Sequence, residues 1–172
     1  MLASGVDKDA TSGVRTLLRR EESYAVHTIV YVAENPGASS ARIAEDLQFP
    51  PAFLAKVLGR LSKAGYVESR PGRTGGVRLT VDPSDLSLLD VIQTVSGPLL
   101  MDTCQTRQQC ATQQRKGFCN VNGMWMRTTL LMHDVFGGVR MSDLVDPEAL
   151  AQLREDMGPP DRKAPKVKGM GA

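Results

Sequence analysis

The sequence predicts a mainly α-helical fold with one small β-hairpin. Apolar residues recur with helical spacing in four segments before residue 98. A glycine-rich turn separates two short runs of β-type residues at 66–80, and a broad apolar band follows at 122–136. With 172 residues, 41% hydrophobic and 23% charged, the chain has the composition of one ordinary globular domain. No apolar run approaches the ~20 residues needed to span a bilayer, so no membrane association is expected.

The first three predicted helices follow one another closely. The first runs from about Glu22 to Glu34 and ends before a Pro-Gly turn. Its predicted buried stripe is Val26, Ile29, Val30 and Ala33. A short second helix, capped by Ser39 or Ser40, runs through Leu47. Pro51 suits the first turn of a third helix, because its missing N–H would be unpaired there. The third helix ends at Gly65, and its predicted buried stripe is Leu54, Val57, Leu58 and Leu61.

The opposite face of the third helix combines small and basic residues: Ala52, Ala55, Lys56, Gly59, Arg60 and Lys63. Small residues let a helix backbone approach a major groove, while Lys and Arg reach phosphates or guanine edges. The competing interpretation is a merely solvated face. The local charge favours the first interpretation, because residues 51–80 carry six basic side chains against the single Glu68.

A β-hairpin is predicted after the third helix. Two short strands, 66–69 and 77–80, flank a glycine-rich tip that carries Arg70, Arg73 and Gly75. Such a hairpin resembles a wing that would place Arg70 or Arg73 in a minor groove beside the third helix. A nucleotide-cradling loop is the alternative, but the tip lacks the G-x-x-x-x-G-K-S/T pattern. The predicted DNA-contacting residues are Ala52, Lys56, Arg60, Lys63, Arg70, Arg73 and Gly75.

A fourth helix at 87–95 and a long apolar stretch at 122–136 complete the predicted helices. The stretch contains Trp125 and carries more apolar residues than one small domain needs, which favours a homodimer interface. The alternative is an ordinary helix that folds back on the core of its own domain. DNA half-sites related by symmetry also favour a dimer.

Three cysteines stand in a polar stretch between these helices, as Cys104-x5-Cys110-x8-Cys119. Their neighbours are mostly Gln, Thr, Arg and Lys, so burial in a core does not explain them. The odd count excludes a fully paired disulfide framework, and the first ten residues lack the apolar core of an export signal, so a reducing cytoplasm is expected. Zinc is disfavoured because no C-x2-4-C knuckle is present. An iron-sulfur cluster, which accepts irregular spacings, is favoured over reactive thiols without a metal.

Enzymatic chemistry finds little support in the sequence. The two histidines are His27 and His133, and no nucleophile-base arrangement can be argued for either. His133 is followed by Asp134, which predicts a surface pair.

Several stretches together resemble the Rrf-type family of winged-helix iron-sulfur regulators, which includes IscR and NsrR. They are the opening helix at 18–33, the Phe53–Gly65 and Gly72–Leu79 segments, the cysteine loop leading into a Trp-containing helix, and the closing Met141–Val145. The resemblance covers 16–145. It implies a homodimeric transcription regulator that binds a double-stranded DNA operator through the third helix and wing. It also implies an iron-sulfur cluster, 2Fe-2S or 4Fe-4S, held by the three cysteines.

This sequence departs from the family pattern at three places. Pro71 replaces the Arg that often precedes the wing glycine, and the second cysteine gap is longer than is common. Asn122 stands three residues after Cys119, where IscR-like members place a His ligand. The resemblance therefore implies a fourth ligand from the start of the first helix, donated across the dimer, with His27 the first candidate. Ser23 is a weaker ligand at the other matching position, and Glu21 and Glu22 are reserves.

The expected organisation is an extension at 1–15, the DNA-binding domain at 16–98, a cysteine loop at 99–120, a dimerisation helix and closing segment at 121–145, and a tail at 146–172 that is largely disordered after 158. The leading hypothesis is a cytoplasmic transcription regulator whose operator affinity depends on an iron-sulfur cluster. A cluster-free thiol regulator on the same fold and a small iron-sulfur electron carrier are the alternatives.

Overall fold

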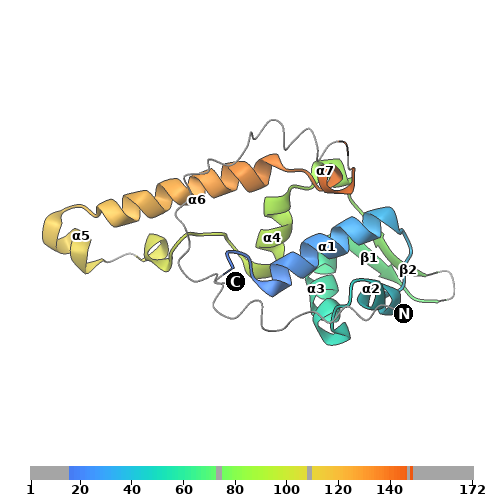
Figure 1. The fold of residues 1–172 in the computed structure, drawn as a ribbon. Helices are drawn as coiled ribbons and strands as arrows, with labels where there is room; N and C mark the ends of the chain where they lie inside the picture. Colours follow the sequence, from blue (N-terminus) through green and yellow to red (C-terminus); the bar gives the residue numbers. More distant parts are fainter. Residues whose placement is uncertain (1–15, 73–74, 108–109, 147, 149–172) are drawn as a thin grey trace, which may run out of the picture.

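The computed structural model describes residues 16–72, 75–107, 110–146 and 148 (Figure 1). The elements in chain order are α1 (Arg20–Glu34), α2 (Ser40–Asp46), α3 (Pro51–Lys63), β1 (Val67–Arg70), β2 (Gly76–Leu79), the 3-10 turn η1 (Pro83–Asp85), α4 (Leu88–Ser96), the 3-10 turn η2 (Thr103–Thr106), α5 (Ala111–Lys116), α6 (Asn120–Gly138) and α7 (Met141–Val145). The fold is mainly helical with one two-stranded antiparallel hairpin, which confirms the predicted fold class. None of the described helices is both long and apolar enough to cross a membrane.

Local sequence signals explain where the helices begin. The Ser39 hydroxyl accepts a hydrogen bond from the Arg42 N–H at 3.2 Å and so caps α2. Pro51 occupies the first turn of α3. At the start of α4, Ser87 and Asp90 form a reciprocal capping box, in which each side chain accepts from the other residue's backbone N–H.

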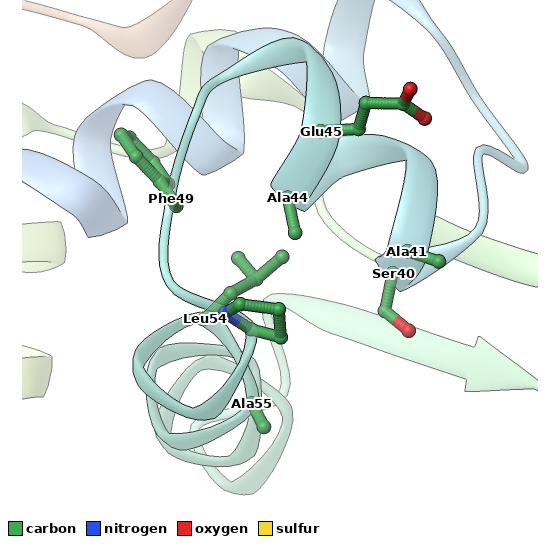
Figure 2. A pocket seen from close by; sticks show the side chains of 8 residues that line it. Ser40, Ala41, Ala44, Glu45, Phe49, Leu54 and Ala55 are labelled. Carbon is green, nitrogen blue, oxygen red and sulfur yellow. The ribbon is translucent and has the colours of Figure 1, made fainter.

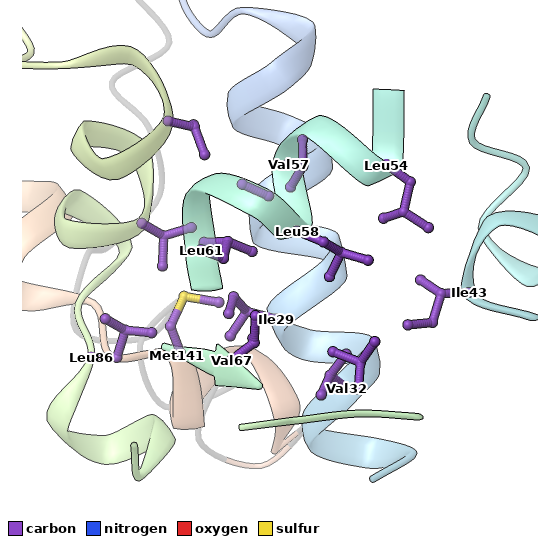
Figure 3. Packing of buried hydrophobic residues seen from close by; sticks show 14 of the residues in the cluster. Ile29, Val32, Ile43, Leu54, Val57, Leu58, Leu61, Val67, Leu86 and Met141 are labelled. Carbon is purple, nitrogen blue, oxygen red and sulfur yellow. The ribbon is translucent and has the colours of Figure 1, made fainter. Parts of the chain in front are cut away.

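The core lies between α1, α3, α4 and the hairpin (Figure 3). The predicted stripe of α3 is confirmed, because all four of its residues are buried: Leu54, Val57, Leu58 and Leu61. The predicted stripe of α1 is one residue out of register. The buried residues of α1 with helical spacing are Ala25, Thr28, Ile29 and Val32.

Thr28 explains why the sequence pattern misled in α1. Its hydroxyl donates to the Tyr24 carbonyl at 2.6 Å, so a residue that reads as polar is buried with its hydrogen bond satisfied. Val26 and Val30 pack against the core only partly.

The hairpin is fixed to the turn between α1 and α2. Its strands pair from Val67 opposite Leu79 to Arg70 opposite Gly76, one residue later at β1 and one earlier at β2 than predicted. The Gly37 N–H donates to the Val77 carbonyl at 2.8 Å, and the Val77 N–H donates to the Ala38 carbonyl at 2.9 Å. The end of β2 nearest the hairpin tip is therefore bonded to the turn before α2.

Helix α6 extends away from this body, with α5 at its far end (Figure 1). Among its described residues only Thr129 is buried, so the alternative of a helix folded into its own core is wrong. Large apolar side chains are instead exposed along it: Val121, Met124, Met126, Leu130, Leu131 and Val135. After α6 the chain returns to the body, where Met141 of α7 is fully buried against the core.

Candidate nucleic-acid interface and cysteine segment

The side of α3 opposite its buried stripe is exposed, as predicted, and it includes Ala52, Lys56 and Lys63. The Lys56 ammonium lies 5.6 Å from the centre of the Phe53 ring. An added Cβ at Gly59 would meet no atom within 4 Å. Packing within the described part of the chain therefore does not require a glycine there.

A hollow of about 380 Å³ separates the first turns of α2 and α3 (Figure 2). Small side chains from both helices line its rim, including Ser40, Ala41 and Ala55, and Leu54 lies at its base. Two larger side chains, Glu45 and Phe49, also line this hollow (Figure 2).

A second hollow, also about 380 Å³, lies between the hairpin and the start of α2. Its lining is mostly hydroxyl, glycine and guanidinium groups, from Ser39, Ser40, Ser69, Gly72 and Arg70. Hydroxyl and backbone N–H donors beside an arginine are the groups that proteins place against nucleic-acid phosphates.

The structure describes two of the three predicted DNA contacts of the hairpin. Arg70 makes an ion pair with Glu68 at 2.9 Å, and its side chain is largely exposed. Arg73 lies outside the described residues. Gly75 has a structural requirement of its own, because an added Cβ would lie 2.0 Å from the Arg70 carbonyl oxygen.

Arg60 lies on the exposed side of α3, as predicted, but its guanidinium is also engaged within the chain. Its Nη1 donates to the Glu21 carboxylate at 2.8 Å and also to the Val95 carbonyl oxygen. One nitrogen of a residue on α3 therefore contacts both the first turn of α1 and the last turn of α4. The contact spans distant parts of the sequence, so helical periodicity could not reveal it.

Arg42, which the sequence analysis did not single out, is held on the exposed side of α2. Its Nε lies 3.4 Å from the Asp46 carboxylate, which also accepts from the Tyr31 hydroxyl. This hydrogen bond raises the pKa of Tyr31 and lowers the pKa of Asp46. The i to i+4 spacing of Arg42 and Asp46 was the signal available in the sequence.

All three cysteines are partly exposed, and each lies at or near a helix start. Cys104 lies in η2, where the Asp102 carboxylate accepts from its backbone N–H at 2.7 Å. Cys110 precedes α5, and Cys119 precedes α6. Backbone N–H groups at helix starts favour a nearby negative charge, so these positions suit thiolates.

The thiols differ in acidity. Burial and the neighbouring Asp102 carboxylate raise the pKa of Cys104, although the Asn122 amide opposes the rise. The backbone N–H groups of Gln113 and Thr112 lower the pKa of Cys110. The Cys119 thiol adds a smaller lowering of the pKa of Cys110.

Three polar side chains on one face of α6 hold the segment that leads to Cys104. Asn122 Nδ2 lies 3.4 Å from the Cys104 carbonyl oxygen and 3.6 Å from its sulfur. The Thr129 hydroxyl accepts from the Met101 N–H at 2.9 Å. His133 Nε2 lies 2.8 Å from the Leu99 carbonyl oxygen, so the predicted surface pair with Asp134 is replaced by a contact to the backbone. We call Asn122, Thr129 and His133 the α6 clamp.

The candidate fourth ligands at the start of α1 are arranged differently from one another. His27 is exposed. Glu22 is buried, and its carboxylate accepts from the Arg19 N–H at 2.6 Å, which occupies it in capping α1. Glu21 is paired with Arg60. Within the described part of one chain, no three His, Cys, Asp or Glu side chains gather into a metal-holding group.

Helices α2 and α3 form a helix-turn-helix, and together with the hairpin beside them and the long helix α6 they define a winged-helix transcription regulator. The sequence model of the Rrf2 family, described as an iron-dependent transcriptional regulator, matches residues 18–147, and the chain belongs to this family. The resemblance inferred from the sequence is thereby confirmed, and the family is one of regulators, not of enzymes.

Individual relatives agree with this assignment. Protein aau3 of Rhizobium meliloti is 30% identical over 131 residues, which cover 74% of this chain and 84% of that protein. The regulator IscR of Vibrio parahaemolyticus is 26% identical over 141 residues, covering 78% and 82%. The structure of CymR, described as the global cysteine regulator of B. subtilis, matches with a TM-score of 0.59 at 21% identity, over 74% of this chain and 95% of that one. The last similarity supports the fold alone.

Proposed function

We propose that this regulator binds DNA as a homodimer and that an iron-sulfur cluster held by Cys104, Cys110 and Cys119 sets its operator affinity. The observation that carries the proposal is the position of Cys104. It lies on a segment held at one end by the α6 clamp and continuous at the other with α4, which packs on α1 and α3. When bound, a cluster supplies a centre that responds to oxidation, nitric oxide or iron loss.

The residues present fit thiolate ligation. Two thiols precede helix starts, and backbone N–H groups lower the pKa of Cys110, so the thiolate that binds metal forms more readily there. The pKa of Cys104 is raised, so its thiolate forms less readily. The amide of Asn122 then remains as a hydrogen-bond donor to the Cys104 sulfur. We propose that the fourth ligand is His27 of the partner subunit, because His27 is exposed whereas Glu22 and Glu21 are occupied within their own chain.

DNA binding is assigned to the exposed side of α3 and to the hairpin. The exposed surface of α3 combines the small residues Ala52 and Gly59 with the basic Lys56. Arg70 lines the hydroxyl-rich hollow at the start of α2. The exposed apolar residues of α6 support assembly with a second copy, because contiguous apolar surface of this kind marks an interface. A dimer with two such reading heads fits a pseudo-palindromic operator.

The test is purification without oxygen, followed by an absorbance spectrum and assays of iron and acid-labile sulfide. A brown protein that loses its colour in the Cys104→Ser, Cys110→Ser and Cys119→Ser variants is expected. A colourless or zinc-containing wild-type protein would contradict the cluster. His27→Ala should shorten the lifetime of the chromophore, with Glu34→Ala, an exposed residue at the other end of α1, as the control. An unchanged lifetime would remove His27 from the ligand set.

A cluster-free thiol switch is the second candidate, because the pKa of Cys110 is lowered and the Cys119 thiol contributes to that lowering. A thiolate beside a second thiol can form a disulfide when an oxidant removes two electrons and the two thiol protons leave. Mass spectrometry of iron-free protein after mild peroxide treatment separates the candidates. A Cys110–Cys119 disulfide that changes operator affinity without iron would favour this switch.

A further inference from the structure

We propose that Arg60 is a positioning residue that joins the recognition helix to the cysteine segment, rather than a residue that reads DNA. The inference rests on the proposed DNA-binding function and deepens it. Its starting point is that Arg60 Nη1 contacts both the Glu21 carboxylate, at 2.8 Å, and the Val95 carbonyl oxygen.

The Val95 contact closes a helix end. Carbonyl groups in the last turn of a helix lack partners within that helix, and they carry partial negative charge. Helix α4 ends at Ser96, so the Val95 carbonyl is such a group, and the guanidinium supplies a charge-assisted donor for it. The last turn of α3, which carries Arg60, is thereby fastened to the last turn of α4.

The chain that leaves α4 runs directly to the cysteine segment. Gly97, with φ of +80°, turns the backbone out of the helix. The α6 clamp then holds the Leu99 carbonyl and the Met101 N–H, and Cys104 follows in η2. The segment between Val95 and Cys104 is short. A change in the position of Cys104 therefore displaces the Val95 carbonyl that Arg60 binds.

Glu21 is the second acceptor of the same Arg60 nitrogen. It lies in the first turn of α1 and is about one-third exposed, while Arg60 is less than half exposed. Because the same Nη1 serves both acceptors, loss of the carboxylate frees the guanidinium to leave the Val95 carbonyl. The angle of α3 relative to α4 then loses a constraint, although no group that faces DNA has been removed.

This arrangement gives opposite predictions for the two roles of Arg60. Removing an acidic side chain near a DNA-binding surface ordinarily strengthens DNA binding, because the protein becomes less negative. If Arg60 reads DNA, Glu21→Gln frees it and leaves operator affinity unchanged or higher. If Arg60 positions α3, Glu21→Gln lowers operator affinity.

The experiment measures operator affinity of the full-length protein against salt concentration for wild type, Glu21→Gln, Arg60→Ala and the matched control Glu34→Gln, which removes an exposed carboxylate from the other end of α1. Glu21→Gln and Arg60→Ala should each weaken operator binding by about fivefold or more. The salt slope should stay unchanged, the effects should not add, and Glu34→Gln should not weaken binding. Circular dichroism confirms folding, and Glu21→Gln keeps the test decisive if Arg60→Ala fails to fold.

Two results would overturn the assignment. One is Glu21→Gln binding at least as tightly as wild type. The other is Arg60→Ala lowering the salt slope by about one or relaxing preference at a single base pair, as a DNA contact does. Failure of the proposed function looks different, because wild-type protein would then not distinguish operator from random DNA.

Discussion

Asn122 of α6 donates from its side-chain nitrogen to both the carbonyl oxygen and the sulfur of Cys104, at 3.4 and 3.6 Å. Asn122 stands where the family pattern places a histidine ligand, and it contacts Cys104 directly. An amide N–H directed at a sulfur stabilises the thiolate relative to the thiol, which opposes the burial and Asp102 charge that raise the pKa of Cys104.

Replacing Asn122 should raise the pKa of Cys104 further. In Asn122→Ala the thiolate loses its side-chain donor, and in Asn122→Asp it also meets a second negative charge, so the rise should be larger. Alkylation of Cys104 by iodoacetamide against pH, followed by mass spectrometry, measures the shift in the iron-free protein. Thr128→Ala is the control, because the Thr128 hydroxyl donates to the Met124 carbonyl of its own helix at 3.0 Å. An unchanged profile in Asn122→Asp would show that the contact does not act on the sulfur.

The cysteines should also differ in reactivity within the wild-type protein. The pKa of Cys110 is lowered by N–H groups at the start of α5, whereas that of Cys104 is raised by burial. As pH rises, the Cys110 thiolate forms first, so its alkylation should reach half-maximum at a lower pH than alkylation of Cys104. The same two profiles in urea should converge, because the folded environment causes the difference. Profiles that remain apart in urea would point to the neighbouring sequence instead.

The sequence predicted some elements closely because their signals are local. In α3 the apolar spacing, the N-terminal Pro51 and the following Gly65 all agree, and the helix and its buried stripe were both correct. Helix α5 was missed because it has no apolar stripe. Good helix formers ended by Gly117, with φ of +77°, were its only signal.

The site was only partly predictable for a different reason. The cysteines and Lys56 follow from residue type and spacing, but the roles of Arg60 and His133 depend on the positions of backbone carbonyls. Val95 lies 35 residues from Arg60 in the sequence, and Leu99 lies 34 residues from His133. A periodic sequence pattern does not indicate which distant main-chain oxygen a side chain binds. These two contacts are therefore seen only in the folded structure.

Lys56 should contribute to DNA affinity through charge. Lys56→Ala is expected to weaken binding to operator and random DNA alike and to reduce the salt slope by about one, which is the signature of a lost phosphate contact. Lys116→Ala removes the same charge from α5, at the far end of α6 (Figure 1), and serves as the matched control. Equal effects of the two variants would mean that overall charge, and not the α3 surface, governs binding.

Replacing Met141 tests whether α7 packs on the core. Its side chain is fully buried, so Met141→Ala should lower the free energy of unfolding by about 2–5 kcal/mol. Urea denaturation at fixed protein concentration measures the change. Met126→Ala truncates an exposed methionine of α6 and should have a much smaller effect. A Met141→Ala variant as stable as wild type would show that α7 does not pack on α1 in solution.

The apolar residues of α6 should hold the dimer together. Met124, Leu131 and Val135 recur at i, i+7 and i+11, which places them on one side of the helix, and each is at least half exposed. This side lies about half a turn from the α6 clamp, so one face can bind the cysteine segment while the other binds a second copy.

Leu131→Asp introduces a charge into the centre of that face and should convert the dimer to monomer without loss of helix content, because Leu131 makes no contribution to the buried core. Sedimentation velocity measures the oligomeric state, and circular dichroism measures the helix content. Met126→Asp, on a different side of α6, should leave the dimer intact. The monomer should bind a single half-site weakly and lose its preference for the pseudo-palindrome. If Leu131→Asp remains dimeric, another surface joins the two copies. The proposed placement of His27 beside the partner's cysteines would then depend on that other surface.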